Sequence, residues 1–402
     1  MASTADVIVV GGGVTGLTAA LQLRERGVRE VLVLERHTVG AGQSGRAAGV
    51  VRGTVRHDVV SQMQLEGQEF LGNFTEKYGI PLDVHRVGYL LVASREHRSY
   101  VQATRAVASR AGCNVREIDE ATALTLQPGL ADSPSAIYLH EPGGVYVDPM
   151  PATHAILLAA RQAGVRVIDD CPVRTLRTEK GKIRGVDTES ERYSAPVVFL
   201  ATSVWAQPLL ATMGWELPVR PHVAEMAFFH VPASSDFRLN CVLFDSRVGL
   251  YMRPEEQRLL FVGRRESDYY GTDKDLVDPD CYRQTATHSA IKEMHVRLGT
   301  ALPPMHAGFV HRTYACTYDV TPDEMPILDR FCGTEGLYFA LGFSGGGFSS
   351  APWIAKRMAA WMDLGVSPPE IEMFRAARFN TGQLIRWANT PADEMGGAAP
   401  DG

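Results

Sequence analysis

Two stretches near opposite ends of the chain have the same order of features: an apolar run, a glycine-rich segment, and then apolar residues at helical spacing. Near the start, an apolar β-branched run at 7–10 is followed by glycines, by apolar residues at helical spacing, and by a second apolar run at 31–34. Near the end, an apolar run at 337–341 leads into the glycine-rich segment 342–347 and then into an amphipathic helix. Each pattern predicts a strand, a turn and a helix that begins at the turn.

The middle of the chain contains more strands. Segment 143–176 predicts a turn, a helix over 151–163 and a strand near 165–168, and the run at 195–206 is typical of a buried strand. Between about 215 and 330, apolar runs alternate with polar turns, which favours a largely antiparallel sheet. The pattern therefore indicates an α/β (α+β) protein with interleaved segments.

The first glycine-rich turn has the form Gly11-x-Gly13-x-x-Gly16, and the second strand ends on Glu35. In this arrangement Gly11 permits a tight turn, Gly13 lets the backbone approach a pyrophosphate, and Gly16 lets the helix pack against the strand. The helix N-terminus favours the phosphate charge, and Glu35 is placed for a ribose hydroxyl. The alternative is a glycine-rich turn in an unrelated α/β protein. We favour a dinucleotide that contains ADP, and this motif alone leaves NAD and FAD both open.

The composition of the chain limits the kinds of molecule that it is expected to bind. The chain has 402 residues and a net charge of -6 without charged blocks, which argues against nucleic acid and anionic membrane surfaces. The six cysteines are scattered and form no metal-binding spacing, so we expect reduced thiols, a cytoplasmic location and no metal. No basic leader and no apolar run of about 18 residues is present, and we expect neither export nor a membrane span.

The two glycine-rich elements together favour FAD. The polar segment 37–53 leaves the first βαβ unit earlier than an NAD-binding domain would. The distant loop 342–347 presents backbone N–H groups and a helix N-terminus to an anionic or electron-rich group. Two such elements are most simply explained if both contact one elongated cofactor.

The motifs "VIVVGGGVTGL", "AGVVR", "GGVYVDP", "CTYDVTPDE" and "GFSGGGF" together resemble the D-amino acid oxidase superfamily of FAD enzymes, most closely its sarcosine oxidase-like branch. The resemblance covers nearly the whole chain. It implies a Rossmann-type FAD-binding domain assembled from discontinuous segments and a mostly antiparallel β-sheet domain above the substrate. The expected segments are 1–80, 143–215 and 311–380 for FAD, 81–142 and 216–310 for the substrate, and 381–402 as a tail.

The resemblance also implies site residues. The cysteine before "TYDVTPDE" matches the family cysteine that forms a thioether to the flavin 8α carbon, so it predicts a covalent link through Cys316; the alternative is a buried free cysteine. The candidate cofactor-binding residues are Gly11, Gly13, Gly16, Glu35, Arg36, Ser44, Val173, Cys316, Gly342, Gly345, Gly346, Gly347 and Phe348.

The substrate side agrees with the family only in part. The resemblance places a substrate carboxylate at Arg52, the active-site tyrosine at Tyr251, and the position of a family histidine at Arg265, and these three are the catalytic candidates. Two family lysines are replaced, one that pairs with the carboxylate by Ser349 and one that assists oxygen reduction by Phe261. The replacements leave both the substrate and the electron acceptor open.

The expected activity is oxidation of a C–N bond in an amine or N-substituted amino acid to an imine, with oxygen or another acceptor taking the electrons. An amine with a free lone pair needs no strong protein base. One alternative is a dehydrogenase that uses a non-oxygen acceptor. Others are hydroxy acid oxidation, for which His222 or His311 would be the nearest bases, and a non-catalytic flavoprotein subunit.

Overall fold

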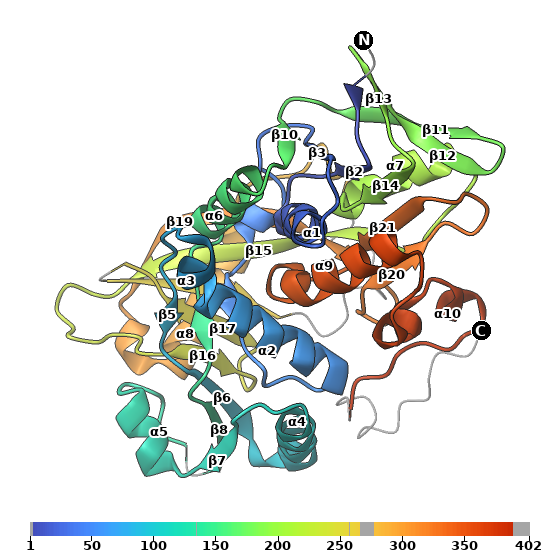
Figure 1. The fold of residues 1–402 in the computed structure, drawn as a ribbon. Helices are drawn as coiled ribbons and strands as arrows, with labels where there is room; N and C mark the ends of the chain where they lie inside the picture. The colour runs from blue at the N-terminus through green and yellow to red at the C-terminus, as the bar shows by residue number, and fades with distance from the viewer. Residues whose placement is uncertain (1–2, 134, 257, 266–276, 389–402) are drawn as a thin grey trace.

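The computed structural model describes residues 3–133, 135–256, 258–265 and 277–388. One half of the protein is built on a six-stranded sheet whose strands are drawn from widely separated parts of the chain (Figure 1). In order across the sheet, they are β10 (Arg166–Ile168), β3 (Val31–Leu34), β2 (Val7–Val10), β14 (Val197–Leu200), β21 (Leu337–Leu341) and β20 (Ile327–Arg330). All neighbours pair in parallel except β20 and β21. The prediction of a Rossmann-type sheet from discontinuous segments is confirmed.

The four central strands of this sheet, β3, β2, β14 and β21, are apolar at every position because both faces of the sheet are covered. Val7 and Val9 pack against helices on one face, whereas Ile8 and Val10 pack into a second cluster on the other. The helical face carries α1 (Val14–Glu25), α6 (Pro149–Gln162) and α9 (Gly347–Leu364). The other face carries α7 (Ala206–Ala211) and a four-stranded sheet of β1 (Ser3–Thr4), β13 (Arg192–Ser194), β12 (Lys182–Thr188) and β11 (Val173–Glu179).

The other half is an eight-stranded sheet. In order, its strands are β19 (Phe309–Val320), β15 (Arg220–His230), β18 (Leu259–Arg264), β17 (Leu250–Pro254), β16 (Val242–Asp245), β6 (Tyr89–Ser94), β8 (Ala136–Glu141) and β7 (Arg116–Ile118). Every pair is antiparallel except β16 with β6. Helix α8 (His288–Ala301) packs Met294 and Leu298 onto this sheet. The expected mostly antiparallel sheet is therefore present.

Strand β19 connects the two halves. It pairs with β15 in the eight-stranded sheet, and beyond Cys316 it reaches the loop that follows β21, where the Ser344 N–H donates to the Asp319 carbonyl at 3.2 Å. Part of the predicted cofactor segment 311–380 thus belongs to the antiparallel sheet. The division into domains at the particular residues given above remains a prediction.

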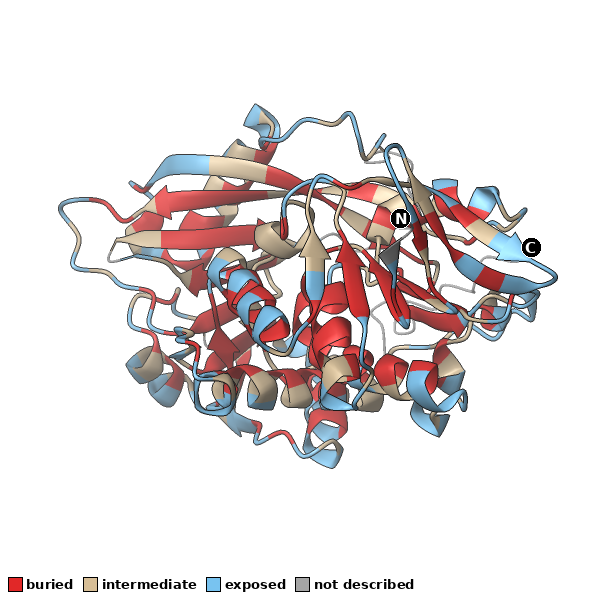
Figure 2. Cartoon of the chain, turned by 45° about the horizontal axis from the view of Figure 1, so that its top comes forward, coloured by how far each residue is buried: buried red, intermediate tan, exposed pale blue. Residues whose placement is uncertain are grey.

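Burial follows this layered arrangement. Figure 2 shows buried residues concentrated on the strands and on the inward sides of the helices, with exposed residues on the outer faces. All six cysteines are free thiols. Among the helices that the structure describes, none combines the length and the apolar character needed to cross a membrane.

Part of the predicted tail packs against the body of the protein. The Ile385 N–H donates to an Asp323 side-chain oxygen at 3.1 Å, and the Trp387 indole N–H donates to the Asp323 carbonyl at 3.1 Å. The Asp323 carboxylate is itself held by Arg378 at 2.7 Å. Residues 389–402 of the predicted tail lie outside the described residues.

Candidate functional site

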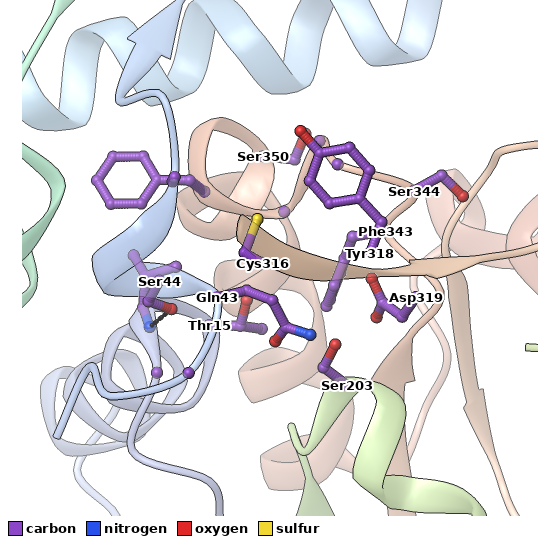
Figure 3. Close-up of a pocket in the computed structure, with 18 of the residues that line it drawn as sticks. Thr15, Gln43, Ser44, Ser203, Cys316, Tyr318, Asp319, Phe343, Ser344 and Ser350 are labelled. Carbon is purple, nitrogen blue, oxygen red and sulfur yellow. Dashed lines mark hydrogen bonds between the residues drawn. The ribbon is translucent and has the colours of Figure 1, made fainter. Parts of the chain in front are cut away.

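A cavity of about 870 Å³ is lined by residues from both sheets and from the loops that join them. It is continuous from the turn at Gly11 to Arg52 and Tyr251 on the eight-stranded side. Figure 3 shows part of its wall, with Thr15 and Ser44 on the α1 side and Cys316 and Asp319 on β19. The cavity thus brings the two glycine-rich elements of the sequence to one site.

The first glycine-rich turn requires glycine at two positions. Gly11 has a φ of 112°, and an added Cβ would lie 2.4 Å from the Ala201 carbonyl oxygen. A Cβ on Gly16 would lie 2.0 Å from the Gly11 carbonyl oxygen. These contacts confirm the packing expected of a tight strand-to-helix turn, which leaves the N-terminus of α1 at the cavity wall.

Gly13 and Ser44 form the edge of this helix N-terminus. Gly13 is the N-cap residue of α1, and as a glycine it has no side chain that could cap the helix. The Ser44 hydroxyl accepts a hydrogen bond from the Val14 N–H at 2.9 Å and would lie 2.8 Å from a Cβ on Gly13. The absence of a side chain at Gly13 makes room for this hydroxyl beside the positive end of the helix, which lies at the cavity wall and would stabilise a pyrophosphate.

Glu35 lies beside the same turn at the end of β3. Its carboxylate accepts hydrogen bonds from the Gly12 N–H at 2.7 Å and from the His37 N–H at 3.0 Å. These bonds orient the side chain at the cavity wall, as expected for a residue that binds a ribose.

Arg36 belongs to a cluster that the sequence did not reveal. Its guanidinium lies 2.6 Å from the Asp280 carboxylate, which also accepts from the Trp205 indole N–H at 2.8 Å. The guanidinium stacks over the Trp205 ring at 4.9 Å. Val173 lines the same end of the cavity. This cluster joins residues far apart in the sequence, so no local motif could have indicated it.

Cys316 lines the cavity. Its side chain is buried on β19, opposite Ala224 of β15, and Figure 3 shows the sulfur directed into the space that the labelled side chains surround. Burial raises the pKa of the thiol to about 12, and the nearby Arg46 charge lowers the pKa by less. The thiol is therefore protonated at neutral pH in the protein without cofactor.

The second glycine-rich loop follows β21. Gly342, Ser344 and Gly345 have φ values of 71°, 48° and 88°, a left-handed conformation that favours glycine. The loop ends at the N-terminus of α9, whose helix dipole is directed at the cavity. Of the predicted residues of this element, Gly345, Gly346, Gly347 and Phe348 line the cavity, whereas Gly342 does not; its N–H is bound by the Asp319 carboxylate.

Asp319 holds this loop in place. The buried carboxylate accepts from the Gly342 N–H at 2.8 Å. Burial raises the pKa of Asp319 to about 6, although hydrogen bonds from the Ser203 hydroxyl and the loop N–H groups lower the pKa. The sequence contains Asp319 within "CTYDVTPDE", but nothing in that motif distinguishes it from an ordinary turn residue.

Arg52 lines the cavity on the side of the eight-stranded sheet. Its guanidinium donates to the Thr54 carbonyl and lies 4.8 Å from the centre of the Tyr89 ring. The backbone after Arg52 is fixed by the buried Glu141, whose carboxylate accepts from the N–H groups of Gly53 at 2.8 Å and Thr54 at 2.9 Å. Glu141 was missed because it is a single acid at the end of a strand.

The other two catalytic candidates also line the cavity. The Tyr251 hydroxyl is 3.4 Å from the Tyr318 hydroxyl, and its ring occupies the space left by the absent side chain of Gly263. An Arg265 guanidinium nitrogen is 3.9 Å from a Glu324 carboxylate oxygen. The fold thus brings Arg52, Tyr251 and Arg265 to one cavity from separate elements.

The positions that differ from the family pattern have distinct environments. Phe261 is fully buried and packs against Phe228, behind the residues that line the cavity. Ser349 lines the cavity, and its hydroxyl donates to the Gly346 carbonyl at 3.3 Å. His222 and His311 are not among the described residues that form the cavity wall.

A parallel sheet with a glycine turn at the N-terminus of α1, joined through one cavity to an antiparallel sheet, defines a dinucleotide-binding protein with a separate substrate region. Residues 6–361 match the family described as FAD dependent oxidoreductase, abbreviated DAO. The chain belongs to this family. The earlier resemblance is confirmed at this level.

Individual relatives are distant. The 4-methylaminobutanoate oxidase (formaldehyde-forming) of Paenarthrobacter nicotinovorans is 24% identical over 388 residues, which are 94% of this chain and 46% of that protein. The glycine oxidase of Pseudomonas putida is 27% identical over 356 residues, which are 86% of this chain and 91% of that protein. The chain thus spans about half the length of the first relative and most of the second.

The fold also matches solved structures. The L-proline dehydrogenase from P. horikoshii superposes with a TM-score of 0.86 at 23% identity, over 96% of this chain and 100% of that chain. At this identity the match supports the mixed α/β architecture with several sheets, and it carries no information on the substrate.

Proposed function

We propose that the protein uses FAD to oxidise a C–N bond in an amine or N-substituted amino acid, giving an imine. One observation carries the proposal: the dinucleotide turn at Gly11 and the arginine and tyrosine at Arg52 and Tyr251 open onto one cavity. The two relatives described above are named for glycine and for an N-methylated amino acid. Both compounds hold an amine nitrogen beside a C–H bond and carry a carboxylate.

The residues of the cavity fit FAD. The N-terminus of α1, with Gly13 and Ser44 beside it, would hold the pyrophosphate, and Glu35 would hold a ribose. The loop at Gly345 and the N-terminus of α9 would face the ring system and stabilise negative charge on it. When bound, FAD supplies the acceptor for a hydride equivalent from the carbon next to nitrogen.

Arg52 is the proposed partner of the substrate carboxylate, because the planar guanidinium matches that group. Glu141 holds the backbone that follows Arg52, and the Arg52 guanidinium donates to the Thr54 carbonyl and lies over the Tyr89 ring, so the side chain is oriented before substrate binds. Tyr251, on β17, lines the same cavity and would contact the amine end. An amine that enters as the free base needs no residue to remove a proton first.

We also propose a thioether between Cys316 Sγ and the flavin 8α carbon. The proposal is supported by the position of the thiol at the cavity wall and by its match to the family cysteine. Forming the C–S bond replaces one S–H and one C–H bond and releases two electrons and two protons, which must pass to oxygen or another acceptor. The high pKa of the free thiol means that its proton must be lost during this step.

A dehydrogenase that uses an acceptor other than oxygen is the second candidate. The position of the family lysine that assists oxygen reduction is occupied by the fully buried Phe261, which supplies no charge. Measuring hydrogen peroxide formed per turnover against reduction of an artificial dye separates the two. A dye rate that greatly exceeds the peroxide rate supports the dehydrogenase.

The proposed function is tested by turnover of a substrate panel. Flavin-loaded enzyme is incubated with secondary amino acids, primary amino acids, neutral amines and hydroxy acids, and the carbonyl compound left after imine hydrolysis is identified. We expect carbonyl products from amines only. Arg52→Gln should raise KM for acidic substrates far more than for neutral amines. Turnover of hydroxy acids in place of amines would overturn the proposal.

A further inference from the structure

Three arginines gather at the substrate end of the cavity. Arg52 and Arg56 come from the segment between β4 (Val50–Val51) and α2 (Asp58–Gly72), and Arg265 follows β18. All three line the cavity. Burial lowers the pKa of Arg56 and repulsion from Arg265 and Arg52 also lowers it, whereas Tyr100 and Glu324 act in the opposite direction. The three charges are therefore close enough to act on one another.

Arg56 is held by aromatic rings rather than by an acid. Its guanidinium lies 5.1 Å from the centre of the Tyr100 ring and 5.6 Å from the centre of the Trp387 ring. Its Nη1 is buried and has no hydrogen-bond partner among the described residues. A buried N–H group without a partner costs free energy, and an anion that entered the cavity would satisfy it.

The acids that line the cavity do not balance this charge. Glu35 and Asp280 are engaged at the nucleotide end, and Asp319 is bound to the loop at Gly342. Glu324, near Arg265, is the remaining acid among the described residues of the cavity wall. Among the described residues that line this end of the cavity, three guanidinium groups thus face one carboxylate, and the buried Glu141 lies behind the wall, bound to the Gly53 and Thr54 N–H groups. The lining itself carries two more positive than negative charges, in a protein whose net charge is -6.

This excess exceeds what one substrate carboxylate would neutralise. A monocarboxylic amine bound at Arg52 would leave the Nη1 of Arg56 without a partner and one charge uncompensated. A second carboxylate would accept a hydrogen bond from this Nη1 and would neutralise the remaining positive charge. Leu91 and Phe244 also line the cavity and would contact the carbon atoms of such a substrate.

We propose that the substrate is a dicarboxylic amine, with its α-carboxylate at Arg52 and its second carboxylate at Arg56 and Arg265. The inference rests on the proposed function and names the substrate class for the same site. Because a hydrogen bond to a charged group contributes strongly to binding, we expect the second carboxylate to tighten binding by about 10- to 100-fold.

Binding of unreactive analogues tests the proposal. Flavin-loaded enzyme is titrated by calorimetry with thiodiacetate, which has two carboxylates, and with (methylthio)acetate, which has one. Sulfur replaces the amine nitrogen in both, so binding is measured without turnover. The wild type should prefer thiodiacetate. Arg56→Gln should remove most of this preference and leave the affinity for (methylthio)acetate within about twofold. Arg265→Gln should also reduce the preference for thiodiacetate, although Arg265 lies on a different element from Arg56.

The control is Arg110→Gln, which removes a charge from an exposed arginine paired with Asp58. It should leave the affinity for both acids unchanged within about twofold. Equal binding of the two acids by the wild type would overturn the proposal, as would an equal loss for both in Arg56→Gln with unchanged flavin content. Oxidation of monocarboxylic amines without a dicarboxylate preference would reject the inference and retain the proposed function.

Discussion

Asp319 offers a prediction whose magnitude follows from the structure. The carboxylate is 4% exposed and accepts from the Gly342 N–H at 2.8 Å. Burial raises its pKa from 3.8 to about 6, a change of about two units that corresponds to about 3 kcal/mol. Between these two pH values the native state binds more protons than the unfolded state, so the free energy of unfolding falls as pH rises through this window. Above about pH 6 the protein carries the full cost of the buried charge.

Asp319→Asn removes this cost and keeps an oxygen that can accept from the Gly342 N–H. With an unfolding entropy of about 2.1 cal/mol/K per residue, 3 kcal/mol corresponds to about 3 to 4 °C in Tm for this chain. Tm is measured for flavin-loaded wild type and variant at about pH 4 and about pH 7.5. The Tm of Asp319→Asn minus the Tm of wild type should be larger at the higher pH than at the lower pH, by that amount.

The exposed carboxylate of Asp83 provides the control. Asp83→Asn should show the same Tm difference from wild type at both pH values. The reasoning on Asp319 is refuted if its variant also shows no pH-dependent difference, or if the variant is relatively less stable at the higher pH. The second result would mean that the native state stabilises the charged carboxylate.

Three further predictions concern the cofactor and the loop that follows Arg52. Cys316→Ser should release flavin into the supernatant on acid precipitation, whereas wild-type flavin should stay in the pellet; wild-type release would reject the thioether. Gly16→Ala should purify with little flavin because its Cβ would lie 2.0 Å from a backbone oxygen, whereas Gly143→Ala, with 3.7 Å to the nearest atom, should keep its flavin. Glu141→Gln should destabilise the protein by about 3 kcal/mol in denaturant unfolding and raise KM for acidic substrates through Arg52; unchanged stability would contradict its role.

The glycine-rich turns and the strands beside them were predictable because they are local. A glycine turn between a strand and a helix needs particular residues at fixed spacing, and Gly11, Gly16 and Glu35 lie where that spacing placed them. The apolar runs likewise predicted the two kinds of sheet. The resemblance to a family singled out Cys316, a single residue without a local pattern, and in the structure this residue lines the cavity.

The residues that were missed act across the fold. Asp280 meets Arg36 and Trp205 only after folding, and Glu141 binds a loop that lies far from it in sequence. In the sequence Arg56 resembles any arginine before a helix. Its Nη1 is buried without a hydrogen-bond partner among the described residues only in the folded protein, where the Tyr100 ring packs against the guanidinium. Long-range pairs of this kind have no periodicity or spacing from which they could be recognised.

The central claim is that a C–N bond is oxidised by electron transfer to the bound flavin. It is tested most directly by mixing flavin-loaded enzyme anaerobically with a dicarboxylic secondary amino acid and following the visible flavin absorbance. We expect bleaching, with one carbonyl product formed per flavin reduced, and restoration of the absorbance by oxygen or a dye. An unchanged spectrum with every amine in the panel, while the flavin remains reducible by dithionite, would contradict the account.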